Sequence, residues 1–311
     1  MPSSTRNVQI HSVNDYIEAA TRDNTRRTYR GAVEHFEVDW GGVLPTTSDT
    51  LCRYLAHYAQ TLTFNTLKTR LVALSQWHQS QGFVDPTKAM QVKKVLKGIR
   101  ALHPAPVNKA PPLAMAMLEQ LDRHLNVECQ SDKQGISVRA TRDRALIWVG
   151  FWRGFRSDEL TRLLLQNVEQ SPHHGLSLYL SQSKGDRHYA GKHYPLPVLN
   201  TLCPTAALDC WRGVLSEHEG PIFRKIDRWG VIAEHALNPR SISRILRQRF
   251  EKAGIHNAQT FSSHSLRRGF AYWAAQQRWS LNDLMTHVGW KDTRTAMAYL
   301  ETLHPTFQHS A

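Results

Sequence analysis

Cysteine is scarce in this sequence, and its spacing suits neither a metal site nor a disulfide framework. The chain has 311 residues and four cysteines, none of which forms a C-x-x-C pair. Structural zinc sites and small disulfide-rich domains both need closely spaced cysteines. Seventeen histidines are present, but no pattern of cysteine or carboxylate partners accompanies them. The sequence therefore predicts reduced thiols, no metal and no cofactor.

Long apolar runs are also missing. The longest, residues 145–152, has eight residues and is closed off by Arg144 and Arg153. A membrane-spanning helix needs about 20 apolar residues. The N-terminus has no apolar core of the kind that a signal peptide carries. We therefore expect no membrane partner and no secretion, and we predict a cytoplasmic protein.

Acidic residues are outnumbered along the whole chain. Lys and Arg number 39 against 26 Asp and Glu, which gives a formal net charge of +13. Residues 1–103 hold 13 basic and 8 acidic side chains, and residues 104–311 hold 26 and 18. With 41% hydrophobic residues and nine tryptophans, the chain is expected to fold. A basic folded protein most often binds nucleic acid, but charge alone does not distinguish binding from cutting or rejoining.

Prolines mark the expected boundary between two domains. Four prolines fall within residues 104–112, where they disfavour a helix and favour an extended connector. We therefore predict a helical domain over residues 1–103, a linker over 104–112 and a second domain over 113–311.

Helical periodicity dominates the first of these domains. The predicted helices are residues 14–21, 25–36, 48–62, 66–79 and 86–102. Arg26 and Arg27 begin the second of them, and Lys68 and Arg70 leave the apolar stripe of the fourth. These basic residues are candidate contacts to nucleic-acid phosphates, and the alternative is an ordinary solvated helix face.

The second domain is expected to be mainly α with a small antiparallel β-sheet. Predicted helices are residues 115–126, 141–153, 157–168, 205–215, 241–253, 266–277, 281–287 and 293–300. Apolar residues alternate over 176–182, a turn follows at 184–187, and 193–198 returns as a second strand. Arg244, Arg247 and Arg249 are expected to leave the apolar stripe of the helix at 241–253, so they are either DNA contacts or solvated residues.

Two arginines have a context that suits phosphate binding. His264 and Arg267 are three residues apart, which places them on one helical face. Arg156 follows an apolar helix across a glycine, where a buried guanidinium needs an anion or another acceptor. Taken singly, H-x-x-R is common, and an internal ion pair of Arg156 with Asp158 or Glu159 explains its motif equally well.

Two aromatic residues near the end of the sequence carry further chemistry. Trp290 follows a glycine and has one ring N–H that is able to reach a phosphate oxygen. Tyr299 stands nine residues later, and a tyrosine oxygen is able to form a covalent intermediate. Each of them taken alone is also consistent with a packing aromatic.

In combination and in order, these motifs resemble the tyrosine recombinase family, also called the phage integrases. The family pattern is an arginine in G-[LF]-R-x-x-E-L, a lysine in a β-hairpin, H-x-L-R, glycine with His or Trp, and a tyrosine nine residues later. The matching residues here are Arg156 with Glu159, Lys184, His264 with Arg267, Gly289 with Trp290, and Tyr299. Tryptophan in place of the second histidine resembles the Cre-like branch. The resemblance implies a two-domain architecture, with a helical DNA core-binding domain before a mixed α/β catalytic domain.

The resemblance also implies a mechanism. Tyr299 is the expected nucleophile on a DNA phosphate, and it leaves a 3′-phosphotyrosine and a free 5′-hydroxyl. Arg156 and Arg267 are expected to clamp the phosphate oxygens, with Trp290 and His264 completing the pocket. His264 is the expected proton acceptor, and Glu159 is expected to orient Arg156. Lys184 is the expected acid, with Arg187 or Lys192 as alternatives, and no metal or ATP is required.

The implied partners are double-stranded DNA and further copies of the chain. We expect a homotetramer on paired sites, a monomer or weak oligomer when free, and a possible accessory protein. The protein is expected to act on the nucleoid, for a mobile element or plasmid. Two alternatives remain open: a type IB topoisomerase-like or telomere-resolving enzyme, and a non-catalytic DNA-binding accessory protein.

Overall fold

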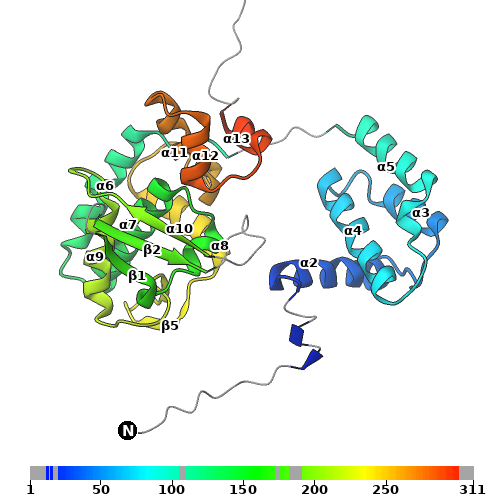
Figure 1. Cartoon of the computed structure of the whole chain (residues 1–311), viewed down its shortest axis with the longest axis horizontal. Coiled ribbons are helices and arrows are strands. Elements are labelled where there is room, and N and C mark those ends of the chain that lie inside the picture. The colour runs from blue at the N-terminus through cyan, green and yellow to red at the C-terminus, as the bar shows by residue number, and fades with distance from the viewer. Residues whose placement is uncertain are drawn as a thin grey trace, which may run out of the picture. The chain divides into compact units, whose positions relative to one another are not determined.

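The chain folds into two compact units, residues 1–108 and 109–311, which are described separately (Figure 1). The computed structural model describes residues 12–13, 15–16, 20–104, 110–171, 175–181 and 191–300. The turn predicted over residues 184–187 lies outside these ranges, as do four of the eight residues of the helix predicted over 14–21.

The N-terminal unit is helical in its described residues. Its elements are α2 (Asp23–Glu34), the π-helix η1 (His35–Asp39), α3 (Ser48–His57), α4 (Phe64–Ser80), the 3-10 helix η2 (Pro86–Lys88) and α5 (Met90–Leu102). Thr47 and Thr63 cap α3 and α4 by accepting hydrogen bonds from the backbone N–H three residues on. The buried core consists of Phe36, Leu51, Tyr54, Leu55, Leu67, Leu71, Leu74, Val92 and Ile99. Four of the five predicted helices are therefore confirmed, with ends shifted by a few residues.

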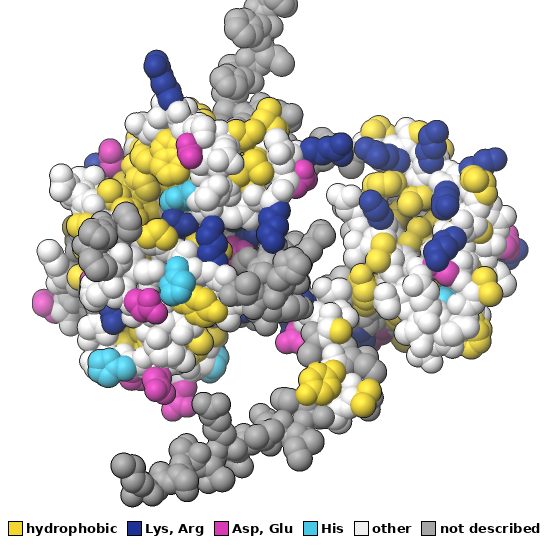
Figure 2. Space-filling model, in the orientation of Figure 1, with side chains coloured by type: hydrophobic (Ala, Val, Ile, Leu, Met, Phe, Trp, Pro, Cys, Tyr) yellow, Lys and Arg dark blue, Asp and Glu magenta, His cyan; other side chains and the backbone are white. Residues whose placement is uncertain are grey.

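Basic side chains gather on one face of this unit. In Figure 2, Lys and Arg are concentrated over α4 and α5. The exposed basic residues of the unit include Arg27, Arg30, Lys68, Lys93, Lys94, Lys97 and Arg100. Two of the predicted phosphate contacts also have protein partners: Arg26 pairs with Asp23, and Arg70 donates to the hydroxyl of Tyr54 at 3.2 Å.

The C-terminal unit is built around one buried helix, α7 (Gln134–Arg153). The other helices are α6 (Met115–Cys129), α8 (Ser157–Thr161), α9 (Pro204–Leu215), α10 (Pro239–Lys252), α11 (Ser263–Gln276), α12 (Leu281–Val288) and α13 (Thr293–Leu300), with 3-10 turns η3 (Leu165–Asn167) and η4 (Ala258–Thr260). Residues 145–151 of α7 are completely or almost completely buried, so the apolar run of the sequence lies in the centre of the core. The helix predicted over 157–168 is wrong, because α8 ends at Thr161 and a strand begins at Val168.

Two small antiparallel sheets complete the unit. One has the order β1 (Val168–Ser171), β2 (Gly175–Leu180) and β3 (Lys192–Leu196), and the other pairs β4 (Arg224–Ile226) with β5 (Ile232–Ala236). The alternation predicted for β2 is confirmed, because Leu176, Leu178 and Leu180 are buried. Leu178 lies opposite Tyr194 of β3. The mainly α fold with small antiparallel sheets is therefore confirmed, although β1, β4 and β5 were not predicted.

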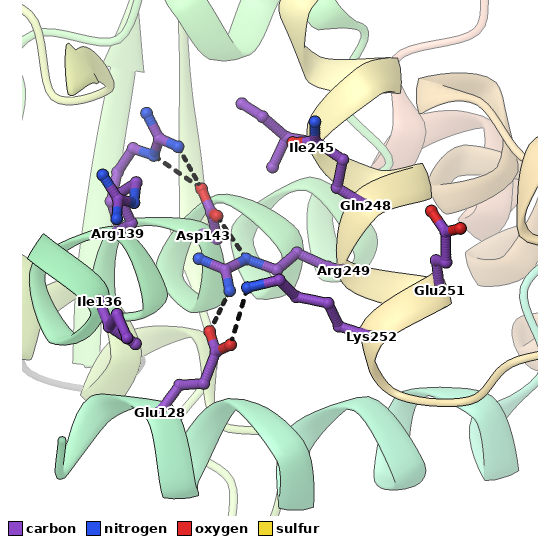
Figure 3. Close-up of a pocket in the computed structure, with 10 residues that line it drawn as sticks. Glu128, Ile136, Arg139, Asp143, Ile245, Gln248, Arg249, Glu251 and Lys252 are labelled. Atoms are coloured by element: carbon purple, nitrogen blue, oxygen red, sulfur yellow. Dashed lines mark hydrogen bonds and ion pairs between the residues drawn. The ribbon is translucent and has the colours of Figure 1, made fainter. Parts of the chain in front are cut away.

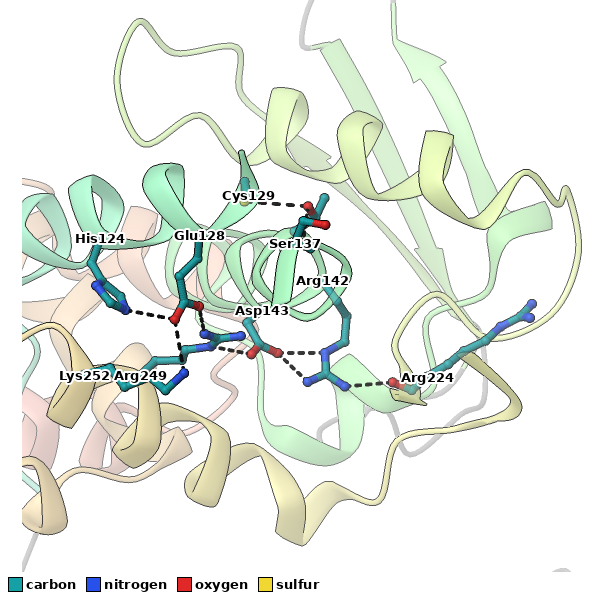
Figure 4. Close-up of polar contacts among 10 residues, drawn as sticks. His124, Glu128, Cys129, Ser137, Arg142, Asp143, Arg224, Arg249 and Lys252 are labelled. Atoms are coloured by element: carbon teal, nitrogen blue, oxygen red, sulfur yellow. Dashed lines mark hydrogen bonds and ion pairs between the residues drawn. The ribbon is translucent and has the colours of Figure 1, made fainter. Parts of the chain in front are cut away.

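A buried ionic network joins α6, α7 and α10. Asp143 accepts a hydrogen bond from Arg249 Nε at 2.6 Å and another from Arg142 Nε at 2.7 Å (Figure 3). Arg249 also pairs with Glu128, and Arg142 Nη1 donates to the carbonyl of Arg224 at 2.9 Å (Figure 4). These groups line a pocket of about 390 Å³. The expectation that Arg249 leaves the apolar stripe is wrong, because Arg249 is buried on the same face of α10 as Ile242 and Leu246. It is therefore an internal structural residue.

A second buried arginine ties the end of α7 to β3 and α12. Arg153 is 3% exposed, and its Nη2 donates to the carbonyl of His287 at 2.7 Å. Its Nη1 faces His287 Nδ1 at 3.1 Å and the carbonyl of Pro195 at 3.4 Å. Since His287 Nε2 lies 2.7 Å from the carbonyl of Trp152, Nε2 carries the proton and Nδ1 accepts. Burial, followed by the charge of Arg153, lowers the pKa of His287 to about 4.

The ionic network generates a prediction for stability. Replacement of Asp143 by Asn removes the carboxylate partner of Arg142 and one of the two carboxylate partners of Arg249. We expect a loss of about 3 kcal/mol in the free energy of unfolding. Chemical denaturation of the whole chain measures this loss. Glu251→Gln is the matched control, because Glu251 lines the same pocket but is exposed. Equal effects of the two substitutions would contradict the structural importance of the network.

The neutral state of His287 predicts a pH dependence of stability. Its folded pKa is about 4 and its unfolded value is 6.5, so between these values the unfolded chain takes up a proton that the folded chain excludes. Stability contributed by His287 is therefore complete above pH 6.5 and falls as the pH drops towards 4, by about 3 kcal/mol. We expect His287→Gln to flatten the measured stability profile in this window. His256→Gln, at an exposed histidine, is the control and is expected to leave the slope unchanged.

Candidate active site

The turn between α7 and α8 positions Arg156. Gly154 ends α7 with a positive φ of 57°, and a Cβ there would lie 3.2 Å from Val288. Arg156 then serves as the N-terminal cap of α8, and its backbone N–H donates to Glu159 Oε2 at 2.8 Å. Its Nη1 donates to Glu159 Oε1, also at 2.8 Å. Because Glu159 is 4% exposed, this double contact fixes the guanidinium at the edge of the site.

Helix α11 carries Arg267 beside the same carboxylate. A hydrogen bond of 2.6 Å between the hydroxyls of Ser157 and Ser263 joins the starts of α8 and α11. Arg267 is 1% exposed and donates from Nη1 to the carbonyl of Gly154 at 2.6 Å. The same Nη1 lies 3.9 Å from Glu159 Oε2. One carboxylate therefore lies next to two guanidiniums, which leaves an excess positive charge.

Trp290 and Tyr299 extend this cluster. The guanidinium of Arg267 lies 5.1 Å from the centre of the Trp290 ring, and the Trp290 and Tyr299 rings are 4.8 Å apart. The guanidinium of Arg268 lies 5.7 Å from the centre of the Tyr299 ring. Trp290 is 5% exposed and Tyr299 is half-buried. The predicted nucleophile thus lies next to the predicted phosphate-binding residues.

The cluster leaves hydrogen-bond donors unused. Among the described residues, six buried side-chain nitrogens have no hydrogen-bond partner, and three of these belong to the contacting side chains of Arg267 (Nε and Nη2) and Trp290 (Nε1). Burial, together with the charge of Arg156, lowers the pKa of Arg267 to about 10, and Glu159 opposes this shift. Buried donors without acceptors are costly. An anion that accepts from them would remove this cost and balance the excess charge.

The structure brings together Arg156, Glu159, Arg267, Trp290 and Tyr299 of the predicted site. His264 lies in the first turn of α11, and its side chain is exposed. Lys184 and Arg187 lie outside the described residues, so the role of Lys184 stays a prediction.

Lys192, the alternative acid, is engaged elsewhere. Its Nζ donates to the carbonyl of Thr286 at 2.9 Å and lies 5.4 Å from the centre of the Tyr194 ring. Partial burial, followed by the charge of Arg153, lowers the pKa of Lys192. Lys192 therefore links β3 to α12.

Sequence reasoning missed Arg268 and the pair of Ser157 with Ser263. Arg268 follows Arg267 directly in H-x-x-R-R, and this doubled arginine was the available signal. The serine pair carries no sequence signal, because its two members are 106 residues apart.

The predicted contacts on α10 differ from one another. Arg244 is exposed, whereas Arg247 is half-buried and donates from Nε to the carbonyl of Phe261 at 2.8 Å.

Within the described ranges, no cluster of three or more His, Cys, Asp or Glu side chains is arranged to hold a metal. No helix in the described part of the chain is long and apolar enough to cross a membrane.

Comparison with known proteins identifies the family. The model of the phage integrase family matches residues 119–305. An integrase/recombinase XerD homolog of Selenomonas ruminantium is 29% identical over 295 residues, which cover 92% of this chain and 83% of that protein.

Two solved structures have a similar fold at low sequence identity. XerH recombinase bound to palindromic difH substrate is 19% identical with a TM-score of 0.60, over 89% of this chain and 76% of that one. A lambda integrase dimer bound to a COC′ core site is 14% identical with a TM-score of 0.59, over 95% and 94% of the two chains. Since the family model spans more than half of the sequence, the chain belongs to the phage integrase family, the tyrosine recombinases that the ordered motifs predicted.

Proposed function

We propose that this chain is a site-specific DNA recombinase that cuts and rejoins duplex DNA through a covalent 3′-phosphotyrosine at Tyr299. The observation that carries the proposal is the group of unpartnered buried donors on Arg267 and Trp290, which lies against the Tyr299 ring. A phosphodiester supplies the oxygens that these donors lack. Family membership and the ordered motifs support the same assignment.

In the proposed cleavage step, the Tyr299 oxygen attacks phosphorus and the bond from phosphorus to the 5′-oxygen breaks. Negative charge then spreads over the non-bridging oxygens, where Arg156 and Arg267 bind them and Trp290 donates its ring N–H. These groups are held in place before the DNA binds, so little reorganisation is needed in the transition state. Arginine supplies the positive charge, and we therefore propose a reaction that requires no metal. Since the phosphotyrosine keeps the energy of the phosphodiester bond, the proposed rejoining requires no ATP.

Proton transfers complete the proposed reaction. His264 accepts the proton of Tyr299, and Lys184 protonates the leaving 5′-oxygen. Glu159 acts by orienting Arg156, which it contacts twice. Attack of a 5′-hydroxyl on the phosphotyrosine reverses the step and rejoins a strand.

The rest of the proposal concerns how the DNA is held. We propose that residues 1–103 form a core-binding domain, joined to the catalytic domain at 113–311 by the linker 104–112. Contacts from Arg26, Arg27, Lys68, Arg70, Arg244 and Arg247 to the DNA backbone are part of the proposal. Such contacts make affinity strongly dependent on salt. The similar XerH and lambda integrase structures are complexes with DNA, which supports a DNA partner.

We also propose an assembly and a setting. The chain is a monomer or weak oligomer when free, and it forms a homotetramer on paired sites. An accessory protein is proposed as a further partner. It acts in the cytoplasm on nucleoid DNA, for a mobile element or plasmid.

A nicked suicide substrate in EDTA tests the chemistry. Because the nick lets the short cleaved fragment diffuse away, we expect a covalent protein–DNA complex to accumulate, detected by denaturing electrophoresis. Tyr299→Phe is expected to abolish the complex while the DNA dissociation constant changes less than about twofold. An adduct that survives this substitution, or that needs magnesium, would contradict the mechanism. Recombination between two sites on one plasmid then separates a recombinase from a type IB topoisomerase-like or telomere-resolving enzyme.

The ring N–H of Trp290 predicts a separate effect. Trp290→Phe keeps an aromatic ring against Arg267 and Tyr299 but removes one donor to the phosphate. We expect the single-turnover cleavage rate to fall at least about tenfold, with DNA affinity unchanged. Trp148→Phe is the matched control, because Trp148 is also buried with an unpartnered ring N–H but lies within the α7 core. Equal losses of rate in both variants would rule out a role for the Trp290 donor.

A further inference from the structure

Arg153 is a buried arginine that the proposed phosphate site does not use. It lies three residues before Arg156, but its guanidinium faces α12 and β3, where it contacts His287 and the carbonyl of Pro195. Its ring contact is also outside the phosphate cluster, at 5.2 Å from the centre of Tyr194. Burial of a cation costs free energy of desolvation, which its hydrogen bonds within the protein must offset. The contacts of Arg153 are therefore expected to be important to the fold or to the site.

The partner of Arg153 is held rigidly. The His287 ring stacks on Phe270 with ring centres 4.6 Å apart and an angle of 15° between the planes. Trp279 meets its edge at 5.2 Å. Both ring nitrogens are used, one by Arg153 and the other by the carbonyl of Trp152. The position of His287 relative to the end of α7 is therefore fixed by two hydrogen bonds and two aromatic contacts.

Only two residues separate His287 from Trp290, and both have little freedom. Val288 packs so closely against Gly154 that a Cβ added to this glycine would lie 3.2 Å from the Val288 side chain. Gly289 has a φ of 74°, and the backbone N–H of Trp290 donates to the carbonyl of Met285 at 2.9 Å. A shift of His287 is therefore transmitted to the Trp290 ring.

The α7–α8 turn also controls the other side of the site. Gly154 directly follows Arg153, and its carbonyl accepts the hydrogen bond from Arg267 Nη1. Arg156, at the end of the same turn, is bound by Glu159. The contact between Arg153 and His287 thus joins α12, which leads to Trp290, to the turn that carries the contacts of Arg156 and Arg267.

We propose that Arg153 and His287 are positioning residues for Trp290, and that their contact aligns the ring N–H with the phosphate oxygen during strand cleavage. This inference rests on the proposed function of the Arg267–Trp290–Tyr299 cluster. It predicts a loss of cleavage rate without a loss of DNA binding, because neither residue is itself a phosphate contact.

His287→Phe and His287→Gln form the first test. Phenylalanine keeps the stack on Phe270 but removes both nitrogens, whereas glutamine offers one donor and one acceptor. We expect the single-turnover cleavage rate of the suicide substrate to fall about tenfold in the phenylalanine variant, with an unchanged DNA dissociation constant. The glutamine variant is expected to recover to within about threefold of the native rate. A native rate in the phenylalanine variant would overturn the inference.

Combination with Trp290→Phe separates positioning from general destabilisation. If His287 acts through the Trp290 donor, the double variant cleaves no more slowly than Trp290→Phe alone. Losses that multiply would overturn the inference. Should His287→Phe fail to fold, Arg153→Lys carries the same expectation, because lysine keeps the charge but has one nitrogen in place of the two that contact Nδ1 and the carbonyl of His287.

A matched control lies on the same helix. Arg139 donates to the carbonyl of Asp227 and is about 21 Å from Arg153 along α7, at about 1.5 Å per residue. Arg139→Lys is expected to leave the cleavage rate within about twofold. If the proposed function itself is wrong, the native protein forms no covalent adduct at Tyr299, which distinguishes that outcome from failure of the positioning role. A normal adduct with a native rate in His287→Phe refutes only the positioning role.

Discussion

The carboxylate of Glu159 lies against two arginines, and the organisation of the site depends on this imbalance. It binds Arg156 twice and lies 3.9 Å from Arg267, so one negative charge faces two positive ones. Because Arg267 is almost completely buried, its uncompensated charge is costly, as its pKa of about 10 indicates. A second buried carboxylate would stabilise the fold more but would fill the donors that a phosphate needs. The site is therefore stable enough to be preformed and keeps donors and positive charge that suit an anion.

In the network around Asp143, carboxylates balance the charge of a buried arginine, which is the reverse of the arrangement around Arg267. Arg249 is buried there too, but it binds Asp143 and Glu128, and none of its buried nitrogens is among the unpartnered ones in the described chain. Its charge is matched, and the contact joins three helices. Arg267 and Arg249 are both arginines on amphipathic helices, so residue type and burial do not separate them. The separating property is whether the donors are satisfied within the protein.

This property explains how much was predictable from the sequence. Ordered motifs predicted Tyr299, Arg267 and Arg156, because the spacing within each motif is local, and the structure places the three side chains in one cluster. The spacing of Arg249 from Ile242 and Leu246 already fits the buried face of α10. Periodicity could not reveal the carboxylates that pair with Arg249, since they lie on α6 and α7, more than 100 residues away in sequence. The same holds for Arg153 with His287. The helix predicted over 157–168 failed because pairing of β1 with β2 outweighs the helical pattern after Thr161.

A neutral partner for Arg153 is consistent with the excess charge of the site. An Asp or Glu at position 287 would bind Arg153 more strongly, but it would add an anion close to the arginines that the phosphate needs. A protonated imidazole would instead repel Arg153 and Lys192, both of which disfavour the charged form of His287. Neutral histidine accepts from Arg153 and donates to the backbone of Trp152 without changing the local charge. It thus ties α12 to α7 and leaves the positive charge of the neighbouring cluster available to the phosphate.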